Sequence, residues 1–408
     1  MAEKTYRPSQ KILENYANVL VNFALGGGKG IKKGDVVRIN IEEVAKPLFI
    51  EIRKAIWKAG GHIISNYRPS NDVDYNVDSD FYLHAQDHQI SFFPSHYFKG
   101  LVKQVDHTVS ILSYTNFHSL KGIDPKKIMA NGKALRQAMD WQREKESAGK
   151  YTWTLGLYGT EASAKEAGMG LKEYWDEIIK ACFLNEKDPM AKWKSVFKNL
   201  EDYRRKLNKL PVDRYHIEGP DVDLWIKQGE KRQWVGGRGA NIPSFELFTS
   251  PDWRGTNGWI KFNQPLYRYG NLLEGIELVF KDGVVVKSKA TKNEKVLKEM
   301  LATEGGNKVG EFSMTDRRFS RITKFMANTL YDENIGGKNG NSHIALGNAY
   351  HDCYAGDISK VNKKTWEKLG FNHSSVHTDI ISTSPRTITA HLKNGKTVVV
   401  YKNGQYAL

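Results

Sequence analysis

The sequence predicts a mixed α/β fold in which an N-terminal α/β domain with a parallel sheet precedes a C-terminal, β-rich α+β domain. Three observations lead to this prediction. A chain of 408 residues is too long for one small core. Strand and helix patterns alternate up to about Gly159, whereas short strands and turns dominate after Arg214. We therefore expect an α/β domain at residues 1–159, a helical connector at 160–210 and a β-rich domain at 211–408.

The N-terminal region alternates between helical and strand patterns. Apolar residues at helical spacing predict a helix over residues 10–25, and the glycines at 26–30 predict a turn after it. Further strands are expected at 35–41, 62–66, 108–112 and 151–157, and further helices at 46–59, 95–103 and 125–145. Strand, helix and strand in succession indicate βαβ units of a parallel sheet. Because no strand is followed by Gly-x-Gly-x-x-Gly, nothing here indicates a nucleotide cofactor.

The remaining segments predict the connector and then a series of hairpins. Helices are expected at 160–168, 171–183 and 190–207, and the last has an apolar stripe typical of packing against a core. Strands are expected at 223–226, 258–262, 276–280 and 284–287, and Asp282 and Gly283 form the turn between the last two. A final hairpin is expected at 387–392 and 397–401, and helices at 294–304 and 319–330.

Potential metal ligands gather near the end of the chain. His343 and Tyr350 are followed further along by His377 and Asp379. The segment around His377 contains Val, Thr and Ile and is typical of a strand, in which His377 and Asp379 point to the same face. Imidazole and carboxylate together suit zinc, cobalt or manganese, although a catalytic site needs more oxygen ligands than these.

Two carboxylates upstream, Glu246 and Glu311, are candidates for those oxygen ligands. The motifs that contain or flank the candidates are Asn241-Ile-Pro with Glu246 and Thr249-Ser-Pro251, Tyr331-Asp-Glu-Asn-Ile-Gly-Gly337, His343-Ile-Ala-Leu-Gly347 with Tyr350, and Val376-His377-Thr-Asp379. In order and spacing these pieces resemble the metallo-aminopeptidase family that includes aminopeptidase T and aminopeptidase S. The resemblance extends from about residue 12 to residue 406.

The resemblance implies a site for two divalent metal ions, expected to be zinc, cobalt, manganese or magnesium. The implied ligands are Glu246, Glu311, His343, His377 and Asp379. Glu333 is implied as a further ligand, and Tyr350 is expected beside the metals as a donor to the developing oxyanion. Catalytic roles are expected of Tyr350 and Glu246. One carboxylate should bridge the two metals, and the residues alone leave open whether it is Glu246 or Glu311.

Two departures from the family pattern lie beside implied ligands. Phe245 stands where a small residue commonly precedes the glutamate, and Ile-Ile-Ser-Thr at 380–383 replaces a run that contains glycine. The loop at 338–341 also lengthens the connection between Glu333 and His343. We expect Phe245 and the 380–383 run to affect pocket shape and specificity more than metal binding.

The implied function is that of a metal-dependent aminopeptidase, which hydrolyses N-terminal residues from peptides with a water activated at the two-metal site. One alternative is a metal-dependent endopeptidase or dipeptidase. The other is a non-catalytic homologue that binds metal or nucleic acid. The sequence contains neither His-Glu-x-x-His nor Gly-x-Ser-x-Gly, which disfavours an ordinary zinc protease or a serine hydrolase.

The composition indicates which binding partners and which cellular location to expect. The net charge is +15, but the basic residues are dispersed, so we expect a basic solvated surface and no specific nucleic acid. The absence of a long apolar run or a signal-like start predicts a cytoplasmic protein with no membrane partner. Cys182 and Cys353 are expected to be reduced thiols. Peptides are the expected substrates, and the family resemblance implies a homodimer.

Overall fold

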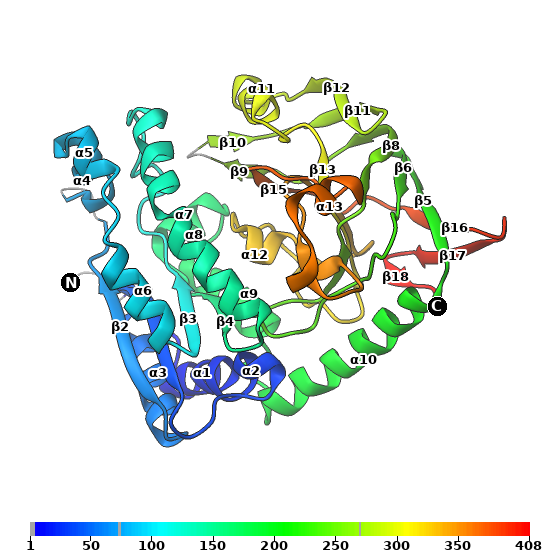
Figure 1. The fold of residues 1–408 in the computed structure, drawn as a ribbon. Coiled ribbons are helices and arrows are strands. Elements are labelled where there is room, and N and C mark those ends of the chain that lie inside the picture. The colour runs from blue at the N-terminus through cyan, green and yellow to red at the C-terminus, as the bar shows by residue number, and fades with distance from the viewer. Residues whose placement is uncertain (1–4, 72–74, 269–270) are drawn as a thin grey trace. The chain divides into compact units, whose positions relative to one another are not determined.

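The computed structural model describes residues 5–71, 75–268 and 271–408, and the chain divides into two compact units (Figure 1). The first unit comprises Met1–Lys192 with Arg238–Ile242, and the second comprises Trp193–Gly237 with Pro243–Leu408. The first contains a parallel sheet and the second contains antiparallel sheets with few helices, which confirms the predicted fold class. The expected domain bounds, with a connector at 160–210, stay a prediction.

The first unit is built on four parallel strands in the order β2-β1-β3-β4. They are β1 (Val36–Glu42), β2 (His62–Arg68), β3 (His107–Leu112) and β4 (Thr152–Leu157). Their bounds agree with the predicted strands to within two residues. In β1 the alternate residues Val37, Ile39 and Ile41 are buried, and the other residues of the strand are only partly buried. The prediction of a parallel sheet from alternating strands and helices is therefore confirmed.

Helices precede, connect and follow these strands. They are α1 (Gln10–Val19), the π-helix η1 (Leu20–Ala24), α2 (Leu25–Gly28), η2 (Glu43–Ala45), α3 (Lys46–Lys58), α4 (Val77–His84), α5 (Asp87–Ile90), α6 (Ser95–Gln104), α7 (Pro125–Ser147), α8 (Glu161–Glu166) and α9 (Leu171–Ala181). The Ser9 hydroxyl caps α1 by accepting a hydrogen bond from the Ile12 N–H. Gly26 and Gly27 have positive φ angles, so the chain turns there as predicted. No helix in the described ranges is long and apolar enough to cross a membrane.

The larger sheet of the second unit follows helix α10 (Pro189–Lys209) and has eight strands, in the order β12-β11-β8-β6-β5-β16-β17-β18. They are β5 (Val212–Gly219), β6 (Val222–Lys227), β8 (Asp252–Lys261), β11 (Glu277–Lys281), β12 (Val284–Lys289), β16 (Thr387–Leu392), β17 (Thr397–Lys402) and β18 (Gln405–Tyr406). Both predicted hairpins, β11–β12 and β16–β17, are confirmed. Strand β8 begins at Asp252 rather than at 258, because Gly255 and Gly258 interrupt the alternation by which the sequence marks a strand.

A smaller antiparallel sheet of four strands, in the order β15-β14-β13-β7, lies against the larger one. Its strands are β7 (Glu246–Thr249), β13 (Val309–Thr315), β14 (Asn341–Gly347) and β15 (His377–Ser382). The Phe312 ring lies 5.7 Å from the ring of Tyr215 on β5 and 5.5 Å from the ring of Trp234. The Tyr406 hydroxyl donates a hydrogen bond to the Met314 carbonyl at 2.6 Å. One face of the smaller sheet is therefore core.

Short elements complete the second unit. They are β9 (Leu266–Arg268), β10 (Asn271–Leu273), α11 (Glu294–Ala302), α12 (Thr329–Asp332), η3 (His351–Cys353), η4 (Ile358–Lys360) and α13 (Lys363–Lys368). Helix α11 confirms the prediction at 294–304, although it ends two residues earlier.

The predicted helix at 319–330 is wrong, since only α12 is helical in that stretch. The buried carboxylate of Asp332 accepts hydrogen bonds from the backbone N–H groups of Met326 at 2.6 Å and Asn328 at 2.8 Å. Between them Ala327 has a positive φ of 50°, which no α-helix allows. A side chain thus takes the backbone donors that a helix would pair internally, and this competition defeats the local helical pattern.

Candidate metal centre

The sequence-predicted ligands converge because strand register places them on one face of the smaller sheet. Paired residues of neighbouring strands share a face, as do residues two apart along one strand. The residues on the face opposite Phe312 are Glu246 and Phe248 of β7, Glu311, Ser313 and Thr315 of β13, Asn341, His343, Ala345 and Gly347 of β14, and His377, Asp379 and Ile381 of β15. Five potential ligands from four separate segments therefore face the same space.

The donor atoms of these five residues lie within a few ångströms of one another. The Nε2 atom of His343 is 3.3 Å from Oε1 of Glu311, 3.4 Å from Oε2 of Glu246 and 3.7 Å from Oδ1 of Asp379. The Nε2 atom of His377 is 3.4 Å from Oδ1 of Asp379 and 3.5 Å from Oε2 of Glu311. Two groups with the spacing of metal ligands result, Glu246 with Glu311 and His343, and Glu311 with His377 and Asp379. Glu311 belongs to both.

Neighbouring groups orient several of these side chains. The Nδ1 atom of His377 lies 2.8 Å from the carbonyl oxygen of Asn348 and must donate to it, which leaves Nε2 as the coordinating atom of the neutral ring. The Ser313 hydroxyl donates to Oε2 of Glu246 at 2.6 Å. The Nδ1 atom of His343 is buried and has no hydrogen-bond partner in the part of the chain that the structure describes.

The electrostatics of the cluster reflect crowded, buried carboxylates. Burial raises the pKa of Glu246 to about 7, an effect that His343 opposes and Glu311 reinforces. Burial also raises the pKa of Glu311. Although burial works against it, the hydrogen bond that His343 donates to Glu311 and the charges of the nearby carboxylates raise the pKa of His343 to about 9. Burial likewise opposes ionisation of Asp379, but the charge and hydrogen bond of His377 lower its pKa to about 2.

Glu333 is buried near this cluster but belongs to neither group of donor atoms. Burial and the charges of Glu246 and Asp379 hold its pKa well above the usual range. Its Oε1 atom accepts a hydrogen bond of 3.3 Å from the side chain of Asn334, which in turn accepts one from the Phe245 N–H. Glu333 is thereby connected to the backbone immediately before Glu246.

Tyr350 lies beside the cluster, and its side chain is 42% exposed. Its ring centroid is 4.7 Å from that of His377 and 5.6 Å from that of Phe248, in both cases edge to face. The backbone N–H of Tyr350 donates to the Ser250 hydroxyl at 2.8 Å. Loss of hydration and the carboxylates, Glu311 first among them, keep the pKa of Tyr350 well above its usual range, so the phenol is a proton donor at neutral pH.

The cluster has the chemistry of a divalent-cation site. Buried carboxylates close together are costly unless a positive charge accompanies them. Oxygen and imidazole-nitrogen ligands suit zinc, cobalt and manganese. The buried His343 Nδ1 and the orientation of His377 leave one nitrogen of each ring directed at the carboxylates. The residues present therefore fit divalent metal ions.

Comparison with known proteins identifies the family. A family model described as thermophilic metalloprotease (M29) matches residues 9–406. The chain belongs to this family. It is accordingly an enzyme, a metal-dependent peptidase that hydrolyses peptide bonds, and the family resemblance found in the sequence is confirmed.

Individual M29 relatives match over nearly the whole chain. Aminopeptidase PepS of Streptococcus thermophilus is 27% identical, with 97% of this chain and 98% of the relative covered. Aminopeptidase AmpS of Bacillus subtilis (strain 168) is 29% identical, with 98% of this chain and 99% of the relative covered. The solved structure of wild-type AmpT from Thermus thermophilus superposes with a TM-score of 0.82 at 22% identity, covering 98% of this chain and 100% of that chain. That structure shows the same fold.

The two departures from the family pattern differ in where they lie. Phe245 is fully buried and its ring stacks on Trp193, with centroids 5.2 Å apart, so it belongs to the core. Of the run at 380–383, Ile381 shares the face of the candidate ligands, whereas Ile380 is on the opposite face. Their influence on specificity stays a prediction.

Ser313 and Phe248 on the ligand face were not foreseen from the sequence. A signal was present in β13, where polar Glu311, Ser313 and Thr315 alternate with apolar Phe312 and Met314. This alternation is typical of a strand with one face in the core. Its polar face is buried as well, so the usual assignment of polar residues to solvent would have failed here.

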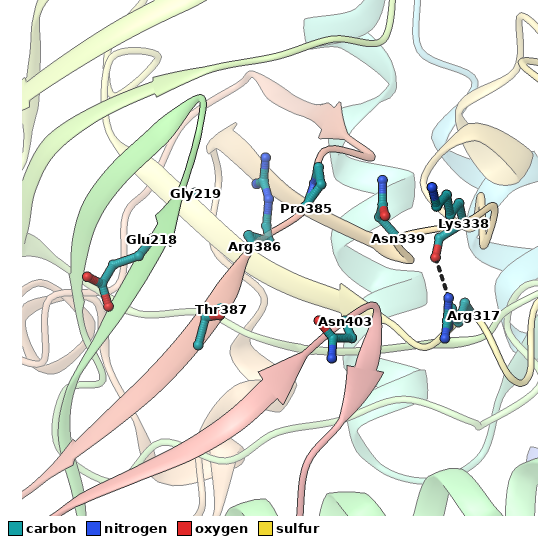
Figure 2. Close-up of a pocket in the computed structure, with 9 residues that line it drawn as sticks. All are labelled: Glu218, Gly219, Arg317, Lys338, Asn339, Pro385, Arg386, Thr387 and Asn403. Carbon is teal, nitrogen blue, oxygen red and sulfur yellow. Dashed lines mark hydrogen bonds between the residues drawn. The ribbon is translucent and has the colours of Figure 1, made fainter.

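The second unit also contains a pocket of about 410 Å³ that includes none of the candidate ligands (Figure 2). Its lining residues are Glu218, Gly219, Arg317, Lys338, Asn339, Pro385, Arg386, Thr387 and Asn403. Arg317 donates to the Lys338 carbonyl at 2.6 Å, and the buried guanidinium of Arg386 donates to Ser342 at 2.7 Å. These arginines are thus held by the protein, and the pocket adds nothing to the metal centre.

Proposed function

We propose that this M29 peptidase is an aminopeptidase that releases residues one at a time from the free amino terminus of peptides, using two divalent metal ions. The observation that carries the proposal is the pair of donor groups on one sheet face, which share Glu311. The aminopeptidase names of its relatives support the same reaction. The proposed ions are zinc, cobalt, manganese or magnesium, and elemental analysis of the purified protein would identify them.

The proposed ligands are Glu246, Glu311, His343, His377 and Asp379. Glu311 is proposed to bridge, because its two oxygens face different histidines, at 3.3 Å from His343 and 3.5 Å from His377. Glu333 is kept as a further proposed ligand, since its buried carboxylate shares the electrostatic environment of the cluster. When bound, two such ions supply an activated water and polarise the carbonyl of the scissile bond.

The chain's own residues have separate parts in the proposed reaction. The Ser313 hydroxyl donates to Oε2 of Glu246, the oxygen that lies 3.4 Å from Nε2 of His343, so it orients this carboxylate within the cluster. The exposure of the side chains increases from 1% at His343 to 22% at His377, and Tyr350 is the most exposed. The substrate is therefore proposed to enter from the side of Tyr350 and His377. Carboxylates of the cluster attract its α-ammonium group, which sets the register of the carbonyl.

Tyr350 is proposed to donate a hydrogen bond to the oxyanion that forms as the carbonyl is attacked. We expect Tyr350→Phe to lower kcat on the order of 10²–10³-fold, the usual cost of losing one such donor. Metal content and KM should change little, because the ring stays between Phe248 and His377. Steady-state kinetics together with elemental analysis would check this, and unchanged kcat would exclude the role.

The aminopeptidase assignment is tested with a peptide and its N-acetylated counterpart. We expect the free-amine peptide to shorten stepwise from its first residue, as followed by time-resolved mass spectrometry. The acetylated peptide should resist cleavage, because it lacks the α-ammonium group that the carboxylates hold. Internal cuts would favour the alternative of an endopeptidase, and hydrolysis of dipeptides with longer free-amine peptides left intact would favour a dipeptidase. Equal hydrolysis of both peptides would remove the aminopeptidase assignment. A metal-loaded protein that cleaves neither would favour the non-catalytic alternative.

We also propose that the protein is a cytoplasmic homodimer. The family resemblance supports the dimer, and the two cysteines support a reducing compartment, since Cys182 and Cys353 are both buried thiols. Sedimentation equilibrium would test the oligomeric state.

A further inference from the structure

Phe248 is a large apolar side chain on the face that carries the candidate ligands. It is two residues from Glu246 on β7, so both side chains point to the same side of the sheet. Its paired neighbour on β13 is Ser313, which pairs in turn with His343. The other residues of this face that are not candidate ligands are small or polar, apart from Ile381. Phe248 therefore brings apolar surface to an otherwise polar site.

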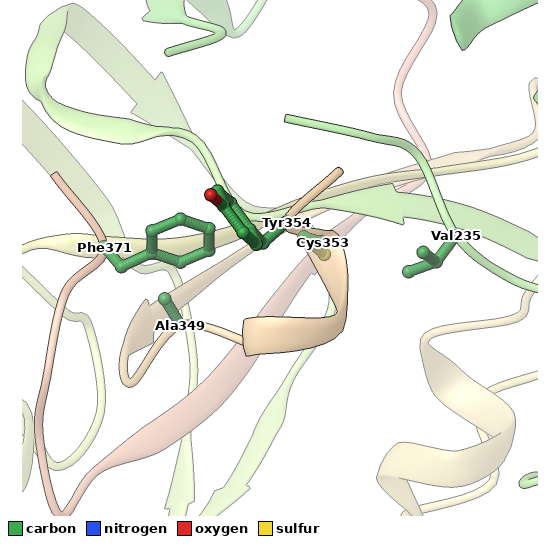
Figure 3. Close-up of a cluster of buried hydrophobic side chains, with 5 residues drawn as sticks. All are labelled: Val235, Ala349, Cys353, Tyr354 and Phe371. Carbon is green, nitrogen blue, oxygen red and sulfur yellow. The ribbon is translucent and has the colours of Figure 1, made fainter. Parts of the chain in front are cut away.

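Packing and backbone hydrogen bonds fix the position of Phe248. It packs against a buried cluster formed by Val235, Ala349, Cys353, Tyr354 and Phe371 (Figure 3). The backbone of β7 at Phe248 is also hydrogen-bonded in both directions to Val235, at 3.0 Å and 2.8 Å. A ring fixed on one side and only partly buried has its remaining surface available to a ligand.

Phe248 and Tyr350 together form a wall at the open side of the cluster. The Tyr350 ring lies edge to face with Phe248 and also contacts His377, so the wall reaches the candidate metal ligands directly. Ile381 is a less suitable contact, because it is only 4% exposed and is on β15, at the opposite edge of the sheet from Phe248. The available apolar surface is thus concentrated at Phe248 and Tyr350.

We propose that Phe248 determines specificity, by forming with Tyr350 the apolar wall that contacts the side chain of the residue being released. This rests on the proposed aminopeptidase function. A substrate whose carbonyl is over the metals has its first side chain within reach of this wall. Burial of apolar surface favours leucine or phenylalanine there over alanine, and a lysine would lose hydration of its ammonium group.

The experiment measures kcat/KM for the p-nitroanilides of leucine, phenylalanine, alanine and lysine with metal-loaded protein. We expect the wild-type protein to prefer leucine and phenylalanine to alanine and lysine. Phe248→Ala should lower the leucine-to-alanine ratio of kcat/KM by about tenfold or more, since each methylene group in an apolar pocket discriminates by roughly 10–200-fold. Phe248→Leu, which keeps apolar surface and avoids a large cavity, should retain most of that ratio.

Phe371→Leu is the matched control, because Phe371 is in the cluster behind Phe248 and is 3% exposed. It should lower the melting temperature without altering the ratio, and metal content should stay unchanged in all three variants. An unchanged ratio in Phe248→Ala, an equal fall in Phe371→Leu, or a wild-type protein indifferent to side-chain size would each overturn the proposal. If the wild-type protein cleaves none of the four substrates, the aminopeptidase function itself fails.

Discussion

Glu311→Gln is expected to lose both metal ions and to lower kcat/KM by a factor on the order of 10⁴ or more. Losses of this size are usual when a residue essential for catalysis is removed. The reason is that Oε1 of Glu311 is 3.3 Å from His343 and Oε2 is 3.5 Å from His377, so each oxygen serves a different donor group. The amide of glutamine keeps the shape of the side chain but removes the charge and one acceptor. The metal content measured by elemental analysis and the rate of peptide hydrolysis should therefore fall together.

A suitable control is Glu51→Gln, which exchanges a buried carboxylate of the first unit that pairs with Lys54 at 2.8 Å. It should leave metal content and hydrolysis near the wild-type values. If Glu311→Gln retains one metal, the shared carboxylate is a different residue, and Glu246 is the next candidate. If it retains both metals and full activity, the proposed centre is wrong.

The extent to which this centre can be predicted from sequence follows from how the strands pair. The segment around His377 has the Val, Thr and Ile content of a strand, and β15 confirms the shared face of His377 and Asp379. The other ligands are brought to this face by pairings between segments far apart in the chain, as when β13, which carries Glu311, pairs with β7, which carries Glu246. Register decides which face each ligand occupies, and a shift by one residue would turn Glu311 into the core.

Local sequence patterns fail where side chains replace backbone partners. The stretch at 319–330 has helical periodicity, but Asp332 takes the N–H groups of Met326 and Asn328. Likewise Ser313 and Asn348 orient Glu246 and His377 from positions that are distant in sequence, so no spacing rule reveals them. By contrast, β1 to β4 follow from the sequence alone, because their apolar runs and intervening helices are local features.

Removal of the metals with a chelator is expected to abolish activity and to leave a protein whose stability falls as the pH rises. In the metal-free protein the pKa of Glu246 is raised to about 7, against about 4.3 in an unfolded chain. Its folded state holds a proton that the unfolded state has lost, so its contribution to stability declines between about pH 4 and pH 7. His343 and His377, with a pKa raised to about 9 in each case, contribute stability at low pH that is lost between about pH 6.5 and pH 9. Asp379, with a pKa of about 2, contributes stability that is lost only as the pH falls below about 4.

The metal-loaded protein should behave differently, because metal ions take the place of those protons and bind more tightly as the ligands deprotonate. The difference in melting temperature between loaded and stripped protein should therefore widen steadily from about pH 5 to about pH 9. Thermal unfolding followed by circular dichroism at several pH values would measure it. Titrating groups elsewhere in the chain are common to both forms and cancel in the difference, so the widening isolates the cluster around Glu311. If the difference in melting temperature stays constant across this range, the metals do not displace protons from the buried carboxylates and histidines.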